Sequence, residues 1–453
     1  MVMDLMERMI GPSPSEVSSG TTLEIAKQMI EWRRAEHDRL DKIHKYLRGK
    51  QPHPFAPRGA PEDVRKLARM SRVNICKIVI SALAQTLYVE GYRQENEGSD
   101  APVWAVWQAN SCDAKQSGIY RAAMAYGASY ATVLPGVNGP EIRGYSPRWM
   151  TAVYADDDDR WPLYALRAIP NRNGWLYRLF DAEAVHYLES NGQGGDLKII
   201  ESEAHGIGET PVVRFLNEID LDEDNDGEIE PLMDLQDQID HTTFGLKVAE
   251  HYGAFKQRAV MGWVAANEEE LLKASAQRVW AFEDPDVKAF EFSETNLDGY
   301  LGSRESSITY AAVLSQVPAH YLLGKMINLS AEALVAAEAS LIRKSKERQH
   351  SFGESQEQVL SLAAQVAGIE TSEGAQVRWS DPEQRTFGAM VDALLKLRQL
   401  GVPVEMLFEK VPWFTQRDVE RAIDLVHAGS PTDQLIALLQ RQEGAFDFDE
   451  DVA

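Results

Sequence analysis

The chain has 453 residues, with 46 Lys and Arg against 70 Asp and Glu, so its formal net charge is −24. This acidic balance argues against a free-standing DNA-binding protein, which would present a basic face to phosphates, and against attachment to an anionic membrane. Two cysteines, a hydrophobic content of 44% and the lack of any apolar run of about 18 residues predict a soluble, intracellular chain of several folded units.

Helical periodicity dominates the first part of the chain. Thr21 and Glu24 fit a capping box, and apolar residues then recur at helical spacing until Gly49. The four prolines of residues 51–61 predict a linker. Three helices are expected here, at about 21–47, 74–91 and 113–126.

Residues 129–217 have a different pattern. Short β-branched and aromatic runs alternate with turn clusters such as Pro-Gly, Asn-Gly and Gly-Gly. Strands at this close spacing predict an antiparallel β region. The four aspartates 156–159 fit an exposed turn, where water can solvate like charges.

After the acidic segment LDEDNDGE the pattern returns to helices. Apolar residues from Leu232 to Gly253 recur in steps of three and four, which predicts a helix from about Ile229 to Met261 that is about 50 Å long. Residues 263–299 are predicted to form a compact insertion with one helix and two strands. Beyond it we expect a helix at 301–315, a loop at 318–330, a long helix at 331–367, and only helices after that.

Motifs for catalysis are missing from the sequence. The Leu323-Gly324-Lys325-Met326 stretch lacks the first glycine and the hydroxyl residue of a phosphate-binding loop, so the chain is not expected to be an ATP-driven motor. Neither a Gly-x-Ser-x-Gly elbow nor a His-Glu-x-x-His zinc helix occurs. We therefore expect no catalytic residue.

His37, Asp41 and His44 would share one face of the first helix, because they stand at positions i, i+4 and i+7. These residue types can bind zinc. A fourth ligand is not evident, which favours a polar face in contact with solvent.

The segment before the long helix resembles part of a calcium loop. Asp222, Asp224 and Asp226 alternate, and Gly227 follows where such a loop turns, with Glu228 next to it. Met233 stands where the loop needs its bidentate glutamate. A structural Ca²⁺ or Mg²⁺ site and a solvated acidic turn both stay open.

A basic cluster lies within the second long helix, at Arg343, Lys344, Lys346 and Arg348. It could face a polyanion. A solvated helix face with pairs between residues i and i+4 is the alternative.

The order of these parts resembles the portal (head-to-tail connector) proteins of tailed double-stranded DNA phages, in particular long-tailed phages of actinobacteria. The resemblance covers nearly the whole chain. Its most specific stretch is PAHYLLGKMINLSAEALVAAEASLIRKSKERQ at 318–349, where a proline and a short Gly/Asn loop precede Ser-x-Glu-Ala-Leu at the start of a helix. Supporting stretches lie at 74–92, 125–133 and 228–242, whereas LDEDNDGEIE departs from the usual pattern.

The resemblance implies an α+β, mainly helical portal fold and a ring, usually of twelve copies, at one capsid vertex. The implied parts are a wing (1–228) with the β region, a stem helix (229–262), an α/β clip (263–299), a returning stem helix (300–316), a tunnel loop (317–330), a long wing helix (331–369) and a helical crown (370–453). The protein would be located in the virion, and in the host cytoplasm during assembly.

The ring would conduct double-stranded DNA without reading its sequence. Tunnel-loop and stem residues are the candidates for contact with DNA: His320, Tyr321, Lys325, Met326, Asn328, Lys247 and Lys256. Clip residues are the candidates for contact with the terminase large subunit and later with head-tail adaptor proteins: Glu268, Glu269, Glu270, Asp284 and Asp286. The other implied partners are further copies of the chain and the major capsid and scaffolding proteins, with no membrane and no cofactor beyond the candidate cation.

Two other functions are compatible with the sequence. A metal-dependent enzyme would use the three aspartates 222, 224 and 226 or the His37 set. A helical scaffold protein that forms no ring would use the same helices for ordinary protein contacts.

Overall fold

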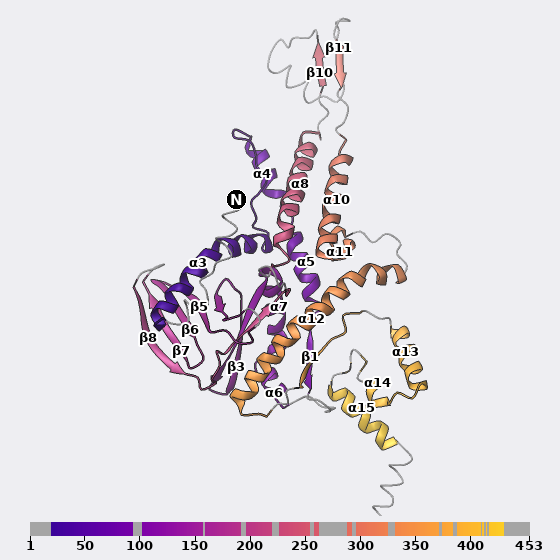
Figure 1. Ribbon diagram of the computed structural model, residues 1–453. Coiled ribbons are helices and arrows are strands. Elements are labelled where there is room, and N and C mark those ends of the chain that lie inside the picture. The colour runs from indigo at the N-terminus through magenta and orange to yellow at the C-terminus, as the bar shows by residue number, and fades with distance from the viewer. Residues whose placement is uncertain are drawn as a thin grey trace, which may run out of the picture. The chain divides into compact units, whose positions relative to one another are not determined.

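The computed structural model describes residues 20–93, 102–156, 159–191, 196–219, 226–253, 258–261, 288–291, 296–324, 331–370, 374–383, 387–408, 410–411, 414 and 416–429 (Figure 1). The chain divides into two compact units. The sheet unit comprises Met1–Ile43, Ile80–Glu228 and Ser330–Ala453, and the helix-pair unit comprises His44–Val79 and Ile229–Leu329.

The predicted antiparallel β region is confirmed and forms two sheets in the sheet unit. The larger sheet has five antiparallel strands in sequence order, β4 (Met150–Val153), β5 (Tyr164–Asn171), β6 (Gly174–Phe180), β7 (Ala184–Ser190) and β8 (Leu197–Ala204). The smaller sheet has the order β3 (Gly139–Tyr145), β2 (Ala128–Gly136) and β9 (Val212–Leu216). Short turns join β2 to β3, β5 to β6 and β6 to β7, which explains why the sequence signal was clear here.

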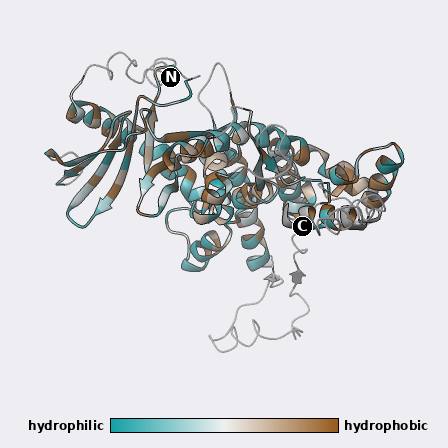
Figure 2. Ribbon diagram, turned by 90° about the horizontal axis from the view of Figure 1, so that it is seen from below, coloured by the Kyte–Doolittle hydropathy of each residue, from teal (hydrophilic) through white to brown (hydrophobic). Residues whose placement is uncertain are grey.

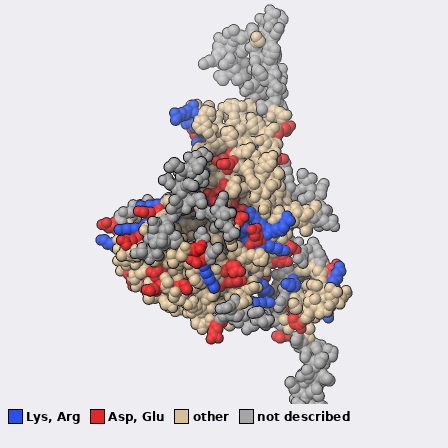
Figure 3. All heavy atoms as spheres, viewed as in Figure 1, with Lys and Arg blue, Asp and Glu red and all other residues tan. Residues whose placement is uncertain are grey.

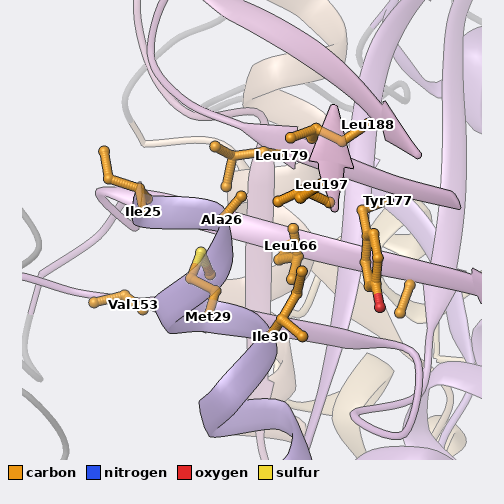
Figure 4. Close-up of a cluster of buried hydrophobic side chains, with 11 residues drawn as sticks. Ile25, Ala26, Met29, Ile30, Val153, Leu166, Tyr177, Leu179, Leu188 and Leu197 are labelled. Atoms are coloured by element: carbon orange, nitrogen blue, oxygen red, sulfur yellow. The ribbon is translucent and has the colours of Figure 1, made fainter. Parts of the chain in front are cut away.

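Helix α3 (Thr22–Leu47) covers one face of the five-stranded sheet. Ile25, Met29 and Ile30 pack onto Leu166 and Leu179 of the strands, so the apolar stripe read from the sequence is the core-facing side (Figure 4). Half of the predicted capping box is present, because the backbone N–H of Thr21 donates a hydrogen bond of 2.7 Å to the Glu24 carboxylate, to which the Thr21 hydroxyl also donates at 2.9 Å.

Two further helices pack against the three-stranded sheet, α7 (Cys112–Tyr126) and the long α12 (Ala331–Ala367). Between them, the ring of Tyr120 stacks on Phe352 with centroids 5.1 Å apart, and Phe215 of β9 lies beside both rings. The Gln356 side chain donates a 2.8 Å hydrogen bond to the Tyr120 hydroxyl. Both helices were predicted from their periodicity.

The helix-pair unit is built around α8 (Met233–Gly253) and α10 (Asp298–Ser315), which pack against each other. Helix α4 (Glu62–Met70) also packs on α8, through Val64, Ala68 and Phe244. The unit also contains η1 (Glu230–Leu232), α11 (Ala319–Leu323) and an antiparallel pair, β10 (Arg258–Met261) with β11 (Lys288–Glu291). The remaining described helices of the chain are α5 (Ile75–Ala84), α6 (Trp104–Ala109), α13 (Phe387–Gln399), α14 (Val404–Phe408) and α15 (Gln416–Gly429).

Three predicted boundaries were wrong. The helix expected at 74–91 ends at Ala84, because β1 (Val89–Arg93) pairs with β12 (Gln376–Trp379), a strand in the segment expected to be only helical. The helix expected to reach Met261 ends as α8 at Gly253, and residues 258–261 pair with β11 instead. The loop expected at 318–330 begins with the short helix α11.

Candidate functional site: an uncharged helix segment and a buried ionic junction

The contact between α8 and α10 depends on small residues. The buried side of α10 consists of Ser307, Ile308, Ala311, Ala312 and Ser315. On α8, Gly245 lies directly against Tyr300, since a methyl group at Gly245 would come within 3.0 Å of the ring. Small side chains let two helices approach closely along their length.

The outer side of the second half of α10, residues 306–315, is exposed, largely apolar and free of full charges. Tyr310, Val313 and Leu314 have 63%, 69% and 58% of their surface exposed. Residues 306–324 contain no Asp, Glu, Lys or Arg, although 26% of the chain is charged. The space-filling view is mainly tan over α8 and α10 (Figure 3). Exposed apolar surface of this kind marks a contact with another protein surface.

A buried polar bracket attaches the proline-rich linker to α8. The Asp240 carboxylate accepts 2.8 Å hydrogen bonds from the Val73 backbone N–H and from the Gln51 amide, while the Gln236 carbonyl oxygen accepts one of 3.0 Å from the Ile75 N–H. Burial raises the pKa of Asp240, although these donors partly offset the effect of burial. The bracket therefore fixes the position of residues 51–75 on α8.

Three of the predicted DNA-contacting residues are described. His320 and Tyr321 lie on α11 with their rings edge to face, 4.6 Å between centroids, and Lys247 is half-buried on α8. The backbone turns between α10 and α11 at Gln316, which has a φ of 57°, and α11 ends at Gly324, with a φ of 66°. The other predicted contacts lie outside the described residues: Lys256, Lys325, Met326, Asn328, Glu268, Glu269, Glu270, Asp284 and Asp286.

A buried ionic junction stands just before η1. The Glu228 carboxylate, 8% exposed, accepts a 2.6 Å hydrogen bond from Lys344 Nζ and one of 3.2 Å from the Arg348 guanidinium. Arg348 also donates to the Asn217 side-chain oxygen at 3.0 Å and lies 3.3 Å from the Glu218 carboxylate. The junction therefore joins the loop after β9 to α12.

Gly227 brings the backbone close enough for the ionic junction to form. A Cβ atom at Gly227 would lie 2.3 Å from the carbonyl oxygen of Ala125, which no side chain tolerates. The neighbouring Glu228 N–H donates a 2.7 Å hydrogen bond to the Met124 carbonyl. A glycine is therefore required here for steric reasons.

The structure corrects the assignment of Glu228 as a cation ligand. Both of its oxygens are bound by protein cations, so they are not available to a metal ion. Asp226 is exposed and lies 3.8 Å from Arg39. Asp222 and Asp224 lie outside the described residues, so an ion site in this loop remains a prediction without Glu228.

The basic cluster on α12 also differs from both interpretations of the sequence. Lys344 and Arg348 are buried at the ionic junction, so neither forms a solvated face or a polyanion surface. Arg343 and Lys346 are exposed, and Lys346 pairs with Glu383 at 2.8 Å.

For the His37 set the sequence favours a polar face over a zinc site, and Asp41 of this set pairs with other side chains of the protein. Asp41 lies 2.6 Å from the Arg148 guanidinium, and the His37 ring is 3.4 Å from Asp41. Within the described ranges, no three His, Cys, Asp or Glu side chains are placed to hold a metal ion. No described helix is long and apolar enough to cross a membrane, and teal and brown residues alternate along the helices (Figure 2).

Comparison with known proteins places the chain in a family. The profile of the phage portal proteins of the SPP1 Gp6-like type matches residues 26–426. The chain belongs to this portal protein family. The family match confirms the resemblance seen in the order of the elements.

The chain is similar to portal proteins of two mycobacterial phages. It is 27% identical over 372 residues to that of Mycobacterium phage D29, covering 75% of each protein, and 26% identical over 369 residues to that of phage L5, covering 74% of each. A chain in the neck of an empty gene transfer agent particle aligns with a TM-score of 0.47 at 15% identity, covering 76% of this chain and 90% of the other.

Sequence reasoning missed the ionic junction of this portal family member. Lys344 and Arg348 stand four residues apart, in line with the buried Phe352 and Gln356, so two cations occupy core positions of the helix. A buried cation requires a counter-charge, and this signal could have pointed to a buried acid elsewhere in the chain.

Proposed function

We propose that this portal family member forms a ring at one capsid vertex, through which double-stranded DNA is packaged and later leaves. The exposed, uncharged second half of α10 supports this proposal most strongly. Tyr310, Val313 and Leu314 form an apolar patch that a neighbouring copy would cover. A ring of identical subunits uses such a head-to-tail contact at every position.

The charge of the chain suits a conduit that does not bind DNA tightly. Twelve copies at −24 each would have a formal charge of −288, and this field repels the DNA phosphates. Lys247 on α8 and Lys325 next to the uncharged segment would then make weak contacts with phosphate, independent of sequence. The role needs no catalytic residue, because a separate terminase would supply the energy.

We assign the contact with the terminase, and later with head-tail adaptor proteins, to the segment 263–299. Its acidic run Glu268–Glu270 offers carboxylates to a basic partner. Replacing these three glutamates with lysines should weaken terminase binding. The matched control reverses the exposed Glu201 and Glu203 of β8, and equal binding by both variants would contradict the assignment.

Shortening the segment 325–328 tests the conduit itself. We expect ring assembly to continue, because the α10 face is intact, while heads contain less DNA. The measurements are end-on electron micrographs of the purified ring and the DNA content of assembled heads. Lengthening the exposed β2–β3 turn at Val137 by the same number of residues serves as the control. Normal DNA filling after the shortening would refute a role of this segment in DNA passage.

A further inference from the structure

A pocket of about 230 Å³ lies between α3 and the five-stranded sheet. One face of α3 supplies Ile30, Arg33, Arg34 and His37, and β6 supplies Trp175 and Tyr177. The spacing of the four helix residues, i, i+3, i+4 and i+7, places them on one side of α3. The proposed portal function makes no use of this pocket.

One buried polar group at the pocket has unused hydrogen-bonding capacity. Tyr177 is 3% exposed, and its side chain lines the pocket. Arg33 is 7% exposed and donates a 2.8 Å hydrogen bond to the Arg148 carbonyl, but its Nε has no partner among the described residues. Buried groups of this kind normally have partners, so a ligand that supplies acceptors would fit.

The charge around the pocket favours an anion. Arg33 and Arg34 both lie close enough to Tyr177 to lower the pKa of its hydroxyl, although burial raises that pKa more. The nearby carboxylate of Asp41 is already held by Arg148 at 2.6 Å. Glu31 and Asp38 are exposed elsewhere on α3 and do not line the pocket. An oxyanion would therefore find two guanidinium groups and a phenol donor in one place.

The walls of the pocket favour a ligand with a flat body. Trp175 is half-buried, and its ring stacks with the Arg33 guanidinium at 5.0 Å and with the Tyr177 ring at 6.3 Å. Ile30 adds an apolar surface on the helix side. Stacked aromatic and guanidinium planes bind planar rings well.

We propose that this pocket binds a phosphate monoester carried on a planar ring, which is the chemistry of a nucleoside monophosphate. The phosphate takes donors from Arg33, Arg34 and Tyr177, and the ring lies against Trp175. A phosphate dianion pairs with two guanidinium groups more favourably than a singly charged carboxylate ligand does.

Titration of the full chain tests this site. Adenosine monophosphate, inorganic phosphate and adenosine are added separately, and binding is followed by calorimetry and by tryptophan fluorescence. We expect saturable binding of the monophosphate, about tenfold weaker binding of inorganic phosphate and none of adenosine. Arg34→Ala should weaken the binding of the monophosphate about tenfold and Tyr177→Phe about fivefold, whereas Arg172→Ala, at the exposed β5–β6 turn, should leave it unchanged.

Three results would overturn the proposal. The first is no saturation at about 10 mM of any phosphate compound. The second is equal affinity in the Arg34 and Arg172 variants, both of which change exposed residues and should fold. The third is tighter binding of an acidic, aromatic peptide than of the monophosphate, which would make the pocket a protein-binding site. Thermal unfolding of Tyr177→Phe checks that its core is unchanged.

Discussion

At the residue scale, Glu228 shows how strongly one side chain can depend on others far along the chain. Two cations, Lys344 and Arg348, share its carboxylate in a region closed to solvent. Asn217 and the exposed Glu218 complete the set around Arg348. Removing the shared acid would leave two buried positive charges next to each other, which is far more costly than losing a surface pair.

Replacing Glu228 with glutamine should therefore lower the free energy of unfolding by about 3–5 kcal/mol, because glutamine keeps the shape and removes the charge. Urea unfolding of the purified chain measures this loss. The matched control is Glu383→Gln, which breaks the surface pair with Lys346 and should cost about 0–1 kcal/mol. Equal losses in the two variants would show that the junction is not the stronger interaction.

The buried Asp240 makes the stability of the fold depend on pH. Its folded-state pKa is raised by burial, so the native state holds this proton more tightly than the unfolded chain does. Its contribution is fully present below the ordinary pKa of 3.8 and is lost as the pH rises through the raised value. The stability advantage of the natural chain over Asp240→Asn should thus shrink as the pH rises from about 4, measured by urea unfolding in steps of pH. A constant or growing difference would contradict this sign.

At the element scale, the periodicity of apolar residues predicted those helices that bury one face along their length. Helices α3, α7 and α12 bury one face, so their periodicity appears in a single stretch of sequence. The β1–β12 pair was missed because its two strands lie nearly 300 residues apart and each has only four or five residues. Boundaries such as Ala84 depend on that distant pairing, which short runs of sequence do not show.

The candidate site was predictable to a similar degree. The uncharged stretch 306–324 is visible in the sequence, but only the structure shows that Tyr310, Val313 and Leu314 remain exposed on α10. The two cations at core positions of α12 indicate a buried acid, but the sequence does not identify Glu228 as that acid, since it lies 116 positions from Lys344. The pocket next to Trp175 could not be predicted, because the sequence does not show which strand packs against α3.

The outer side of α10 leads to a prediction about assembly. Val313→Asp places a charge on the exposed apolar side, so burial against a neighbouring copy would require desolvating it. We expect the folded monomer to persist while high-mass species disappear, as measured by size-exclusion chromatography with light scattering. Val137→Asp, at the fully exposed β2–β3 turn, should assemble normally. If the Val313 variant formed high-mass species as readily as the natural chain, the outer side of α10 would be excluded as the contact between copies.

For the whole molecule, the charge of −24 opposes the association of identical copies. Like-charged subunits repel, and added salt shortens the range of that repulsion to about 10 Å at 0.1 M. The apolar contact on α10 is not weakened by salt in this way. Assembly should therefore depend on the balance between these two interactions.

Raising ionic strength from about 0.05 to 0.5 M should increase the fraction of high-mass species, because screening reduces repulsion while apolar contacts persist. Light scattering at a fixed protein concentration measures the change. The same concentrations of a neutral sugar control for crowding. A falling fraction would instead show that ion pairs between copies hold the assembly together.

The unequal burial of α12 has a mechanical consequence. None of residues 333–340 is fully buried, whereas Leu341, Lys344 and Arg348 are, so the tightly packed part of the helix begins in its second quarter. The ten residues before Leu341 span about 15 Å of helix. Because a helix is stiff, a tilt of about 10° at Leu341 would displace Ala331 by about 3 Å. A movement of this end of α12 would therefore be transmitted to the ion pairs of Lys344 and Arg348 with Glu228.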